Sequence, residues 1–260
     1  MKSALIAYML AGSLLASAAY AEPVLKKTAA SPYFDDIEYY EEGSHVDRVY
    51  IPAIVRTLSE NRPNYQGYEK ILKAYFLSMR SEQKSVPDEV LEVSLPYVQG
   101  VLRDETLEDD ILSSYLLIAM LHQETGMELS PEVLRIAQSS RHSLTLRIAA
   151  LRVLPELGDP KALSALWNLA TTEKDDSLRF NASWSYCAMT ESLPEAFESN
   201  LLIGLTSNPI DAWRTLRLLE KLGPKASSLT TRVDLLKRSG QIELPAHIPQ
   251  ELIPALFREG

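Results

Sequence analysis

Apolar side chains recur along this chain every three or four residues, as they do along one face of an α-helix. One such stripe consists of Ile71, Leu72, Tyr75, Phe76 and Met79. The sustained alternation of apolar and polar residues that is typical of β-strands is not found, and the chain contains only 10 glycines. The pattern therefore predicts an all-α protein.

The same pattern predicts where several helices begin. Proline and serine suit the first turn of a helix, so we expect helices to start near Pro87 and Ser130. The acidic stretch 104–110 precedes an apolar run, and we interpret it as acidic side chains at the positive end of a helix rather than as a metal-binding loop. Pro96 lies inside the helix that starts at Pro87, where it predicts a kink or a break.

A short proline-led sequence opens a leucine-rich run at three places in the second half of the chain. The three prolines are 34 and 30 residues apart, a spacing that is typical of repeat proteins. A further helical pattern precedes each run, so each unit is predicted to be a helix, a turn and a second helix. The three sequences are Pro160-Lys161-Ala162, Pro194-Glu195-Ala196 and Pro224-Lys225-Ala226.

Residues 144–237 resemble HEAT repeats, in particular the HEAT-like repeats of phycobilisome-lyase proteins. The second unit departs from that pattern because it lacks the Gly-Asp pair, and the third has Arg217 where a small residue is expected. The resemblance implies a right-handed α-solenoid, and the helical periodicity of the preceding residues extends it to about five HEAT-like hairpins over residues 46–240. A C-terminal capping helix at 241–260 is expected to close the solenoid. The first unit matches best, with Leu146-Arg147, Ala149, Ala150 and the turn Gly158-Asp159-Pro160.

The N-terminal part of the chain has a different character. Residues 1–21 begin with Lys2, continue with an apolar run and end in Ala19-Tyr20-Ala21, a pattern that predicts a cleaved secretory signal peptide and export to the periplasm. Residues 22–45 form an acidic and aromatic lead-in. We favour an ordered N-terminal cap for this lead-in, and the alternative is a binding arm. Its candidate contact residues are Tyr33, Phe34, Tyr39 and Tyr40.

The net charge excludes one class of partner, and the cysteine content excludes an intramolecular disulfide. The formal net charge of −9 argues against nucleic-acid binding, which needs a basic surface, and is compatible with a basic protein partner. No stable membrane anchor is expected once the signal peptide is removed. Cys187 is the only cysteine, so no intramolecular disulfide can form. Its apolar neighbours predict a buried, inert thiol.

Three arginines occupy equivalent positions in the three units. Arg147, Arg179 and Arg214 are predicted to be structural staples that reach an acidic side chain or a carbonyl group of a neighbouring unit. Asp159 is one of the acidic side chains that we expect to take part. The alternative is a basic ladder that binds an anionic ligand.

The best candidate for a partner contact is Trp167. It lies on the second helix of the first unit, beside the polar positions Lys161, Ser164 and Asn168. In HEAT-like solenoids the second helices usually line the concave side, so these residues are predicted to bind a partner if Trp167 is partly exposed.

The sequence contains no recognisable motif for hydrolysis, phosphate binding or zinc binding, so we assign no catalytic residue, metal ligand or cofactor. The first functional hypothesis is an exported, non-catalytic scaffold or assembly factor that binds a protein on its concave face. An inhibitor or immunity protein that neutralises a basic toxin or enzyme is the alternative. A lyase-like enzyme is the second alternative, and it rests on the family resemblance alone.

Overall fold

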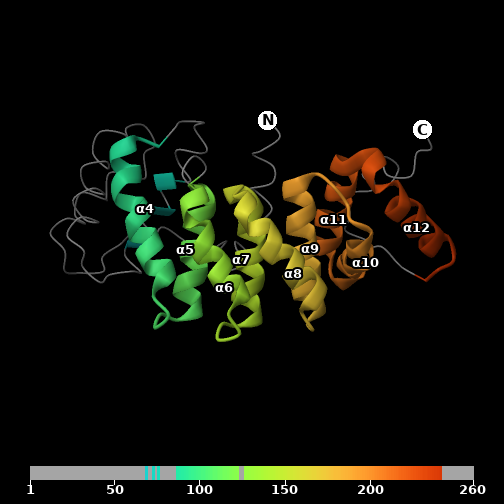
Figure 1. The fold of residues 1–260 in the computed structure, drawn as a ribbon, viewed down its shortest axis with the longest axis horizontal. Coiled ribbons are helices and arrows are strands. Elements are labelled where there is room, and N and C mark those ends of the chain that lie inside the picture. The colour runs from blue at the N-terminus through green and yellow to red at the C-terminus, as the bar shows by residue number, and fades with distance from the viewer. Residues whose placement is uncertain (1–67, 70–71, 74, 77–85, 123–125, 242–260) are drawn as a thin grey trace, which may run out of the picture. The chain divides into compact units, whose positions relative to one another are not determined.

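The protein was analysed as a computed structural model, and the chain divides into two units, Met1–Ala53 and Ile54–Gly260. The predicted signal peptide, the lead-in with Tyr33, Phe34, Tyr39 and Tyr40, and residues 242–260 of the predicted capping segment lie outside the described residues. All described residues, which Figure 1 draws in colour, belong to the second unit. They are residues 68–69, 72–73, 75–76, 86–122 and 126–241.

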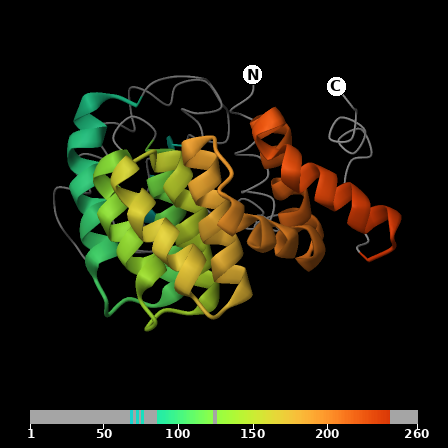
Figure 2. The same cartoon turned by 45° about the vertical axis from the view of Figure 1, so that its right-hand side comes forward.

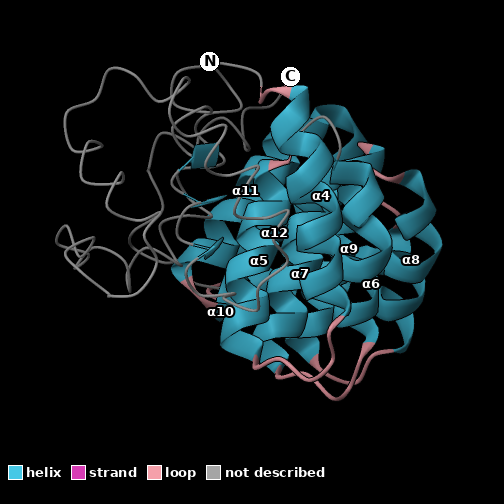
Figure 3. Ribbon diagram, turned by 90° about the vertical axis from the view of Figure 1, so that its left-hand side faces the viewer, coloured by secondary structure: helices cyan, strands magenta, loops and turns pink. Residues whose placement is uncertain are grey.

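Every regular element in this described part of the chain is a helix, and Figure 3 shows it as helices joined by short loops. None of these helices is sufficiently long and apolar to cross a membrane. The α-helices are α4 (Asp88–Arg103), α5 (Asp109–Leu121), α6 (Ser130–Gln138), α7 (Leu144–Leu157), α8 (Leu163–Thr172), α9 (Asp176–Thr190), α10 (Glu198–Ser207), α11 (Pro209–Leu222) and α12 (Ser227–Arg238). The 3-10 turns are η2 (Gly126–Leu129), η3 (Pro160–Ala162), η4 (Glu195–Phe197) and η5 (Gly223–Ala226).

The helix starts predicted at Pro87 and Ser130 are confirmed to within one residue. Three of the helices begin with a side chain that accepts a main-chain N–H from their first turn, which satisfies a donor that the helix itself leaves free. These caps are Ser143 for α7, Asp175 for α9 and Asn208 for α11.

The turn between α7 and α8 shows why the repeat carries its Gly-Asp-Pro sequence. Gly158 ends α7 in the left-handed region at φ +69°, which glycine adopts without steric cost. The carboxylate of Asp159 then accepts the N–H of Lys161 at 3.0 Å, and Pro160 begins the 3-10 turn that leads into α8. Asp159 is thus bonded to the backbone of its own turn.

The sequence predicted a kink or a break at Pro96, and the structure shows no break, because α4 continues through this residue to Arg103. Pro96 is exposed, and so is Glu92, the residue whose carbonyl group loses its helical donor. Water can therefore hydrogen-bond to that carbonyl, which limits the cost of the proline.

The helices pack mainly with their neighbours in the chain, but only one of the three pairs that the sequence repeat suggests, α9 with α10, is among the main contacts. Helix α6 packs against α7, α8 packs against α9, and α10 packs against both α9 and α11. The second helix of one unit therefore lies against the first helix of the next. Helices α5, α7 and α9 also pack side by side (Figures 1 and 2).

Buried polar side chains join successive units as well as apolar contacts. Ser185 of α9 donates from its Oγ to the carbonyl group of Leu151 at 2.7 Å. Asn200 of α10 donates to the carbonyl group of Ala170 at 2.9 Å and to Ser183 Oγ at 2.8 Å. All three side chains are buried, so these bonds keep polar groups satisfied inside the apolar core.

A buried histidine predicts how stability depends on pH. His122 lies at the end of α5 with its ring centroid 4.4 Å from that of Phe76, and burial lowers its pKa to about 4. The unfolded chain therefore takes up this proton first as the pH falls from 6.5 towards 4. We expect this residue to remove about 3 kcal/mol of unfolding free energy over that range. Urea denaturation of the wild type and His122→Gln at several pH values measures the difference, and parallel pH profiles would contradict the prediction.

Candidate binding site

Four of the predicted contact residues share one exposed side of α8 and the turn before it. Lys161, Ser164 and Asn168 are exposed, and Trp167 is 40% exposed. Their spacing of three or four residues places them on the same side of the helix. Helix α8 itself carries no charged side chain. We call these four residues the α8 face.

Trp167 is held by two aromatic rings beneath it. Its ring centroid lies 5.5 Å from that of Tyr186 on α9, in an edge-on arrangement, and 4.7 Å from that of Phe197 in η4. Tyr186 and Phe197 pack edge-on against each other at 5.3 Å. Edge-on and tilted contacts of this kind stabilise aromatic clusters. One part of the indole is therefore fixed in position while the other part faces solvent.

Two of the repeat arginines reach the segment between α8 and α9. Arg147 donates from Nε to the carbonyl group of Ala137 at 2.9 Å and from Nη2 to the carboxylate of Glu173 at 2.5 Å. Arg179 donates to the carbonyl group of Glu173 at 3.0 Å and pairs with Asp176. Glu173 thus receives bonds from both arginines, which belong to successive units.

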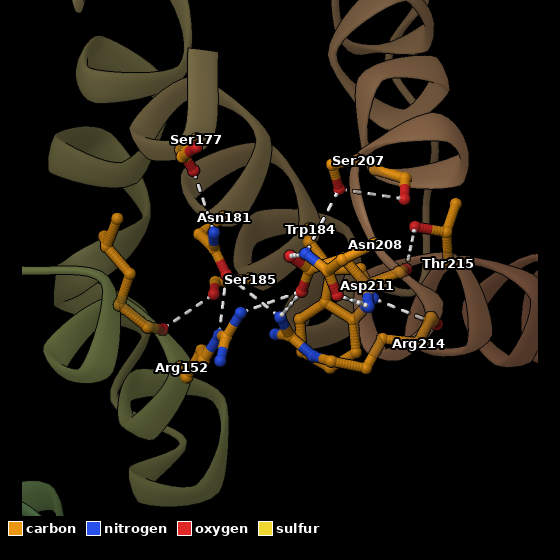
Figure 4. Close-up of polar contacts among 12 residues, drawn as sticks. Arg152, Ser177, Asn181, Trp184, Ser185, Ser207, Asn208, Asp211, Arg214 and Thr215 are labelled. Atoms are coloured by element: carbon orange, nitrogen blue, oxygen red, sulfur yellow. Dashed lines mark hydrogen bonds and ion pairs between the residues drawn. The ribbon is translucent and has the colours of Figure 1, made fainter. Parts of the chain in front are cut away.

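The third repeat arginine belongs to a separate set of polar side chains (Figure 4). Arg214 of α11 donates from Nη1 to Asn181 Oδ1 at 2.9 Å and to Asp211 Oδ1 at 3.0 Å. Arg152 of α7 donates from Nε to the same Asn181 oxygen at 3.0 Å and from Nη2 to the same Asp211 oxygen at 2.8 Å. We call these four residues the arginine cluster. It joins α7, α9 and α11.

The guanidinium of Arg214 is nearly enclosed. Its side chain is 7% exposed, and its Cζ lies 4.2 Å from the centroid of the Trp184 ring, a cation–π contact. The Trp184 indole N–H donates to the Arg214 carbonyl group at 3.1 Å, which fixes the ring. Burial, together with the charge of Arg152, lowers the pKa of Arg214 to about 9. Arg214 is therefore still charged at neutral pH.

The sequence identified Arg214 as a residue that needs an acidic partner, but it did not identify Arg152 or Asn181 as members of a site. The available signal was a second arginine in α7, five residues after Arg147, in the apolar middle of the helix. A charged side chain at a part-buried position needs a partner, so this arginine pointed to a polar contact between units.

The surroundings of Cys187 and Asp109 explain why the pKa of each departs from its usual value. Cys187 is buried as predicted, and burial raises its pKa to about 12, so the thiol is unreactive at neutral pH. Burial raises the pKa of Asp109, but hydrogen bonds from Ser143 and the neighbouring His142 outweigh this effect, so the pKa lies below its usual value. No three histidine, cysteine or acidic side chains gather as a metal site within the residues that the structure describes.

Comparisons with family models, with curated proteins and with solved structures find no match to this chain.

Proposed function

We propose that this chain is an exported, non-catalytic protein-interaction module built from HEAT-like repeats, which binds a protein partner through the α8 face. The observation that carries the proposal is Trp167, an aromatic side chain that is 40% exposed and held in position by Tyr186 and Phe197. Tryptophan is among the residues that contribute most to protein interfaces. A side chain already fixed in its position loses little conformational entropy on binding.

The surroundings of Trp167 support the same proposal. Helix α8 has no charged side chain although 23% of the residues in this chain are charged, and Ser164 and Asn168 are exposed beside the indole. The centres of protein interfaces are depleted of charged residues, because a charge there would lose its hydration on binding. Ser164 and Asn168 can hydrogen-bond with a partner at a lower desolvation cost.

The proposed location rests on the N-terminal pattern of the chain. Residues 1–21 have the basic start, the apolar run and the small-residue end of a secretory signal peptide. In this proposal the partner is a protein of the periplasm, and the module acts as a scaffold or an assembly factor.

A charge placed on the α8 face provides the test. We expect Asn168→Lys to weaken capture of the partner about tenfold or more, because the new ammonium group would be buried unpaired beside Trp167. The tagged full chain is expressed in its own host, and the proteins that it retains are quantified for the wild type and the variant. Thr231→Lys, at an exposed position of α12, adds the same charge on a different helix and is the matched control.

The expected result is one stoichiometric partner that the wild type and Thr231→Lys retain and Asn168→Lys loses. Equal retention by all three proteins would exclude the α8 face as the binding surface. Turnover of a small molecule by the purified chain, without any retained protein, would overturn the non-catalytic assignment.

The alternative, an inhibitor of a basic protein, is favoured by one observation. Residues 86–122 contain eight acidic side chains and one basic side chain, and most of the acidic ones are exposed. Such a surface attracts a basic partner over a distance, and salt screens this attraction. The same capture repeated at high salt separates the two functions, because salt screens the attraction of an acidic surface but not the apolar contact of Trp167.

A further inference from the structure

The arginine cluster holds more positive than negative charge. Arg152 and Arg214 carry two positive charges, and Asp211 is the one carboxylate with which either of them pairs among the described residues. The second acceptor that they share, Asn181 Oδ1, is neutral. An excess charge in a part-buried site is costly unless a counter-ion or a ligand compensates for it.

The acceptors inside the cluster are already occupied. Asp211 Oδ1 accepts bonds from both guanidinium groups, and Oδ2 accepts from Asn208 Nδ2 at 2.7 Å. The amide nitrogen of Asn181 donates to the carbonyl group of Ser177 at 2.8 Å, which orients its oxygen towards the arginines (Figure 4). Neither the acid nor the amide can rotate to supply a further acceptor without breaking these bonds.

Donors remain unused on both arginines. Arg214 Nη2 is buried and has no hydrogen-bond partner. Arg152 donates its hydrogen bonds from Nε and Nη2. Its side chain is 21% exposed, and Nη1 is not one of the atoms that are buried without a partner. The solvent-facing edge of Arg152 is therefore where an additional acceptor can reach the cluster.

From this charge balance we infer that the exposed edge of Arg152 is a binding site for an oxyanion. The oxyanion is either a carboxylate or a phosphate group. The planar guanidinium matches the geometry of both groups, and a charge-assisted hydrogen bond to it is stronger than a neutral one. Arg214 positions Arg152 by sharing Asn181 and Asp211 with it, and its own charge adds to the attraction. This site is separate from the α8 face and does not depend on the proposed function.

A second arrangement in the same protein provides a matched comparison. Arg135 and Arg141 also share one acid, Glu105, but each of them bonds a different oxygen, at 2.8 and 2.6 Å. The side chains of Arg141 and Glu105 are 79% and 48% exposed. Water solvates this excess charge, so it creates no comparable demand for an anion.

The test is an NMR titration of the full-length protein that follows two N–H groups of the arginine cluster and its surroundings. Sodium phosphate, sodium acetate and sodium chloride are titrated at matched ionic strength, and NMR records the Arg152 Nε–H and Trp184 indole N–H signals. We expect both signals to shift and saturate with phosphate, with acetate or with both, and to remain unsaturated with chloride. The anion that binds more tightly, phosphate or acetate, shows whether the natural ligand carries a phosphate or a carboxylate group.

Two variants separate binding from general charge effects. Arg152→Gln leaves one arginine and one aspartate in the cluster. We expect it to lower the affinity for the oxyanion about tenfold or more. Arg141→Gln is expected to leave the affinity unchanged. If Arg152→Gln does not fold, Arg152→Lys keeps the charge, loses the planar fork and is expected to reduce the affinity severalfold. Shifts that match those with chloride, or equal affinity in the wild type and the Arg152 variant, would overturn the inference.

Discussion

Replacing Asp211 with Asn is expected to lower the free energy of unfolding by about 3–5 kcal/mol. Asparagine has nearly the same shape as aspartate and keeps one acceptor oxygen. The loss of stability is therefore caused by the missing negative charge. Without it, the two guanidinium groups of Arg152 and Arg214 would stand side by side with no carboxylate, and the side chain of Arg214 is only 7% exposed. Urea denaturation followed by circular dichroism measures the loss.

Two further variants show whether the charge balance is responsible. Asp234→Asn makes the same change on the surface of α12, where Asp234 pairs with an arginine that is 73% exposed, and is expected to cost less than about 0.5 kcal/mol. Arg152→Gln is expected to cost about 1 kcal/mol, because it leaves Arg214 and Asp211 as a balanced pair. A loss for Asp211→Asn no larger than for Asp234→Asn would show that Asp211 is not the required counter-charge.

The second large effect is expected from Gly204→Ala in α10. A Cβ at this position would lie 2.1 Å from Cε2 of Phe180, and the Phe180 side chain is buried, at 1% exposed. Alanine favours a helix over glycine by about 1 kcal/mol, but overpacking of a core costs about 1–3 kcal/mol, and a contact this short places the cost at the upper end. We therefore expect a net loss of about 2 kcal/mol in a urea denaturation experiment.

The matched control is Gly100→Ala in α4. A Cβ there meets no atom within 4 Å, so helix propensity alone should act and raise stability by about 0.5–1 kcal/mol. A double-mutant cycle with Phe180→Leu tests the cause, since the smaller side chain should reduce the cost of Gly204→Ala. Equal costs in both backgrounds would rule out the contact with Phe180.

Local sequence patterns predicted the helices and their turns well. The helix start at Ser130, the proline-led turn at Pro160 and the left-handed end of α7 at Gly158 all depend on backbone preferences of a few adjacent residues. The absence of a break at Pro96 has a local cause as well. The rule for proline is most severe where the backbone is buried, and periodicity did not reveal that Pro96 faces solvent.

Pairing of the helices was harder to predict. The sequence repeat groups α7 with α8 because they flank the same turn, whereas α8 packs chiefly against α9. An apolar stripe shows which side of a helix is buried but does not identify the helix that covers it. The number of hairpins and the handedness of the proposed solenoid remain predictions.

The two candidate sites differ in how far the sequence could reveal them. The α8 face follows from helical spacing, since Ser164, Trp167 and Asn168 fall on one side of any helix drawn through them. The arginine cluster does not, because Arg152 and Asp211 are 59 residues apart and belong to helices that the repeat places in different units.

The order of residues along the chain decided which segments are helical, where they begin and end, and which side chains share one side of α8, because these properties depend on atoms within about four residues of each other. The assembled fold decided that Arg152 and Arg214 share a single carboxylate, that Gly204 lies against Phe180 and that part of Trp167 stays in water. Those contacts depend on the distances and angles between packed helices, which the apolar pattern of an individual helix does not specify.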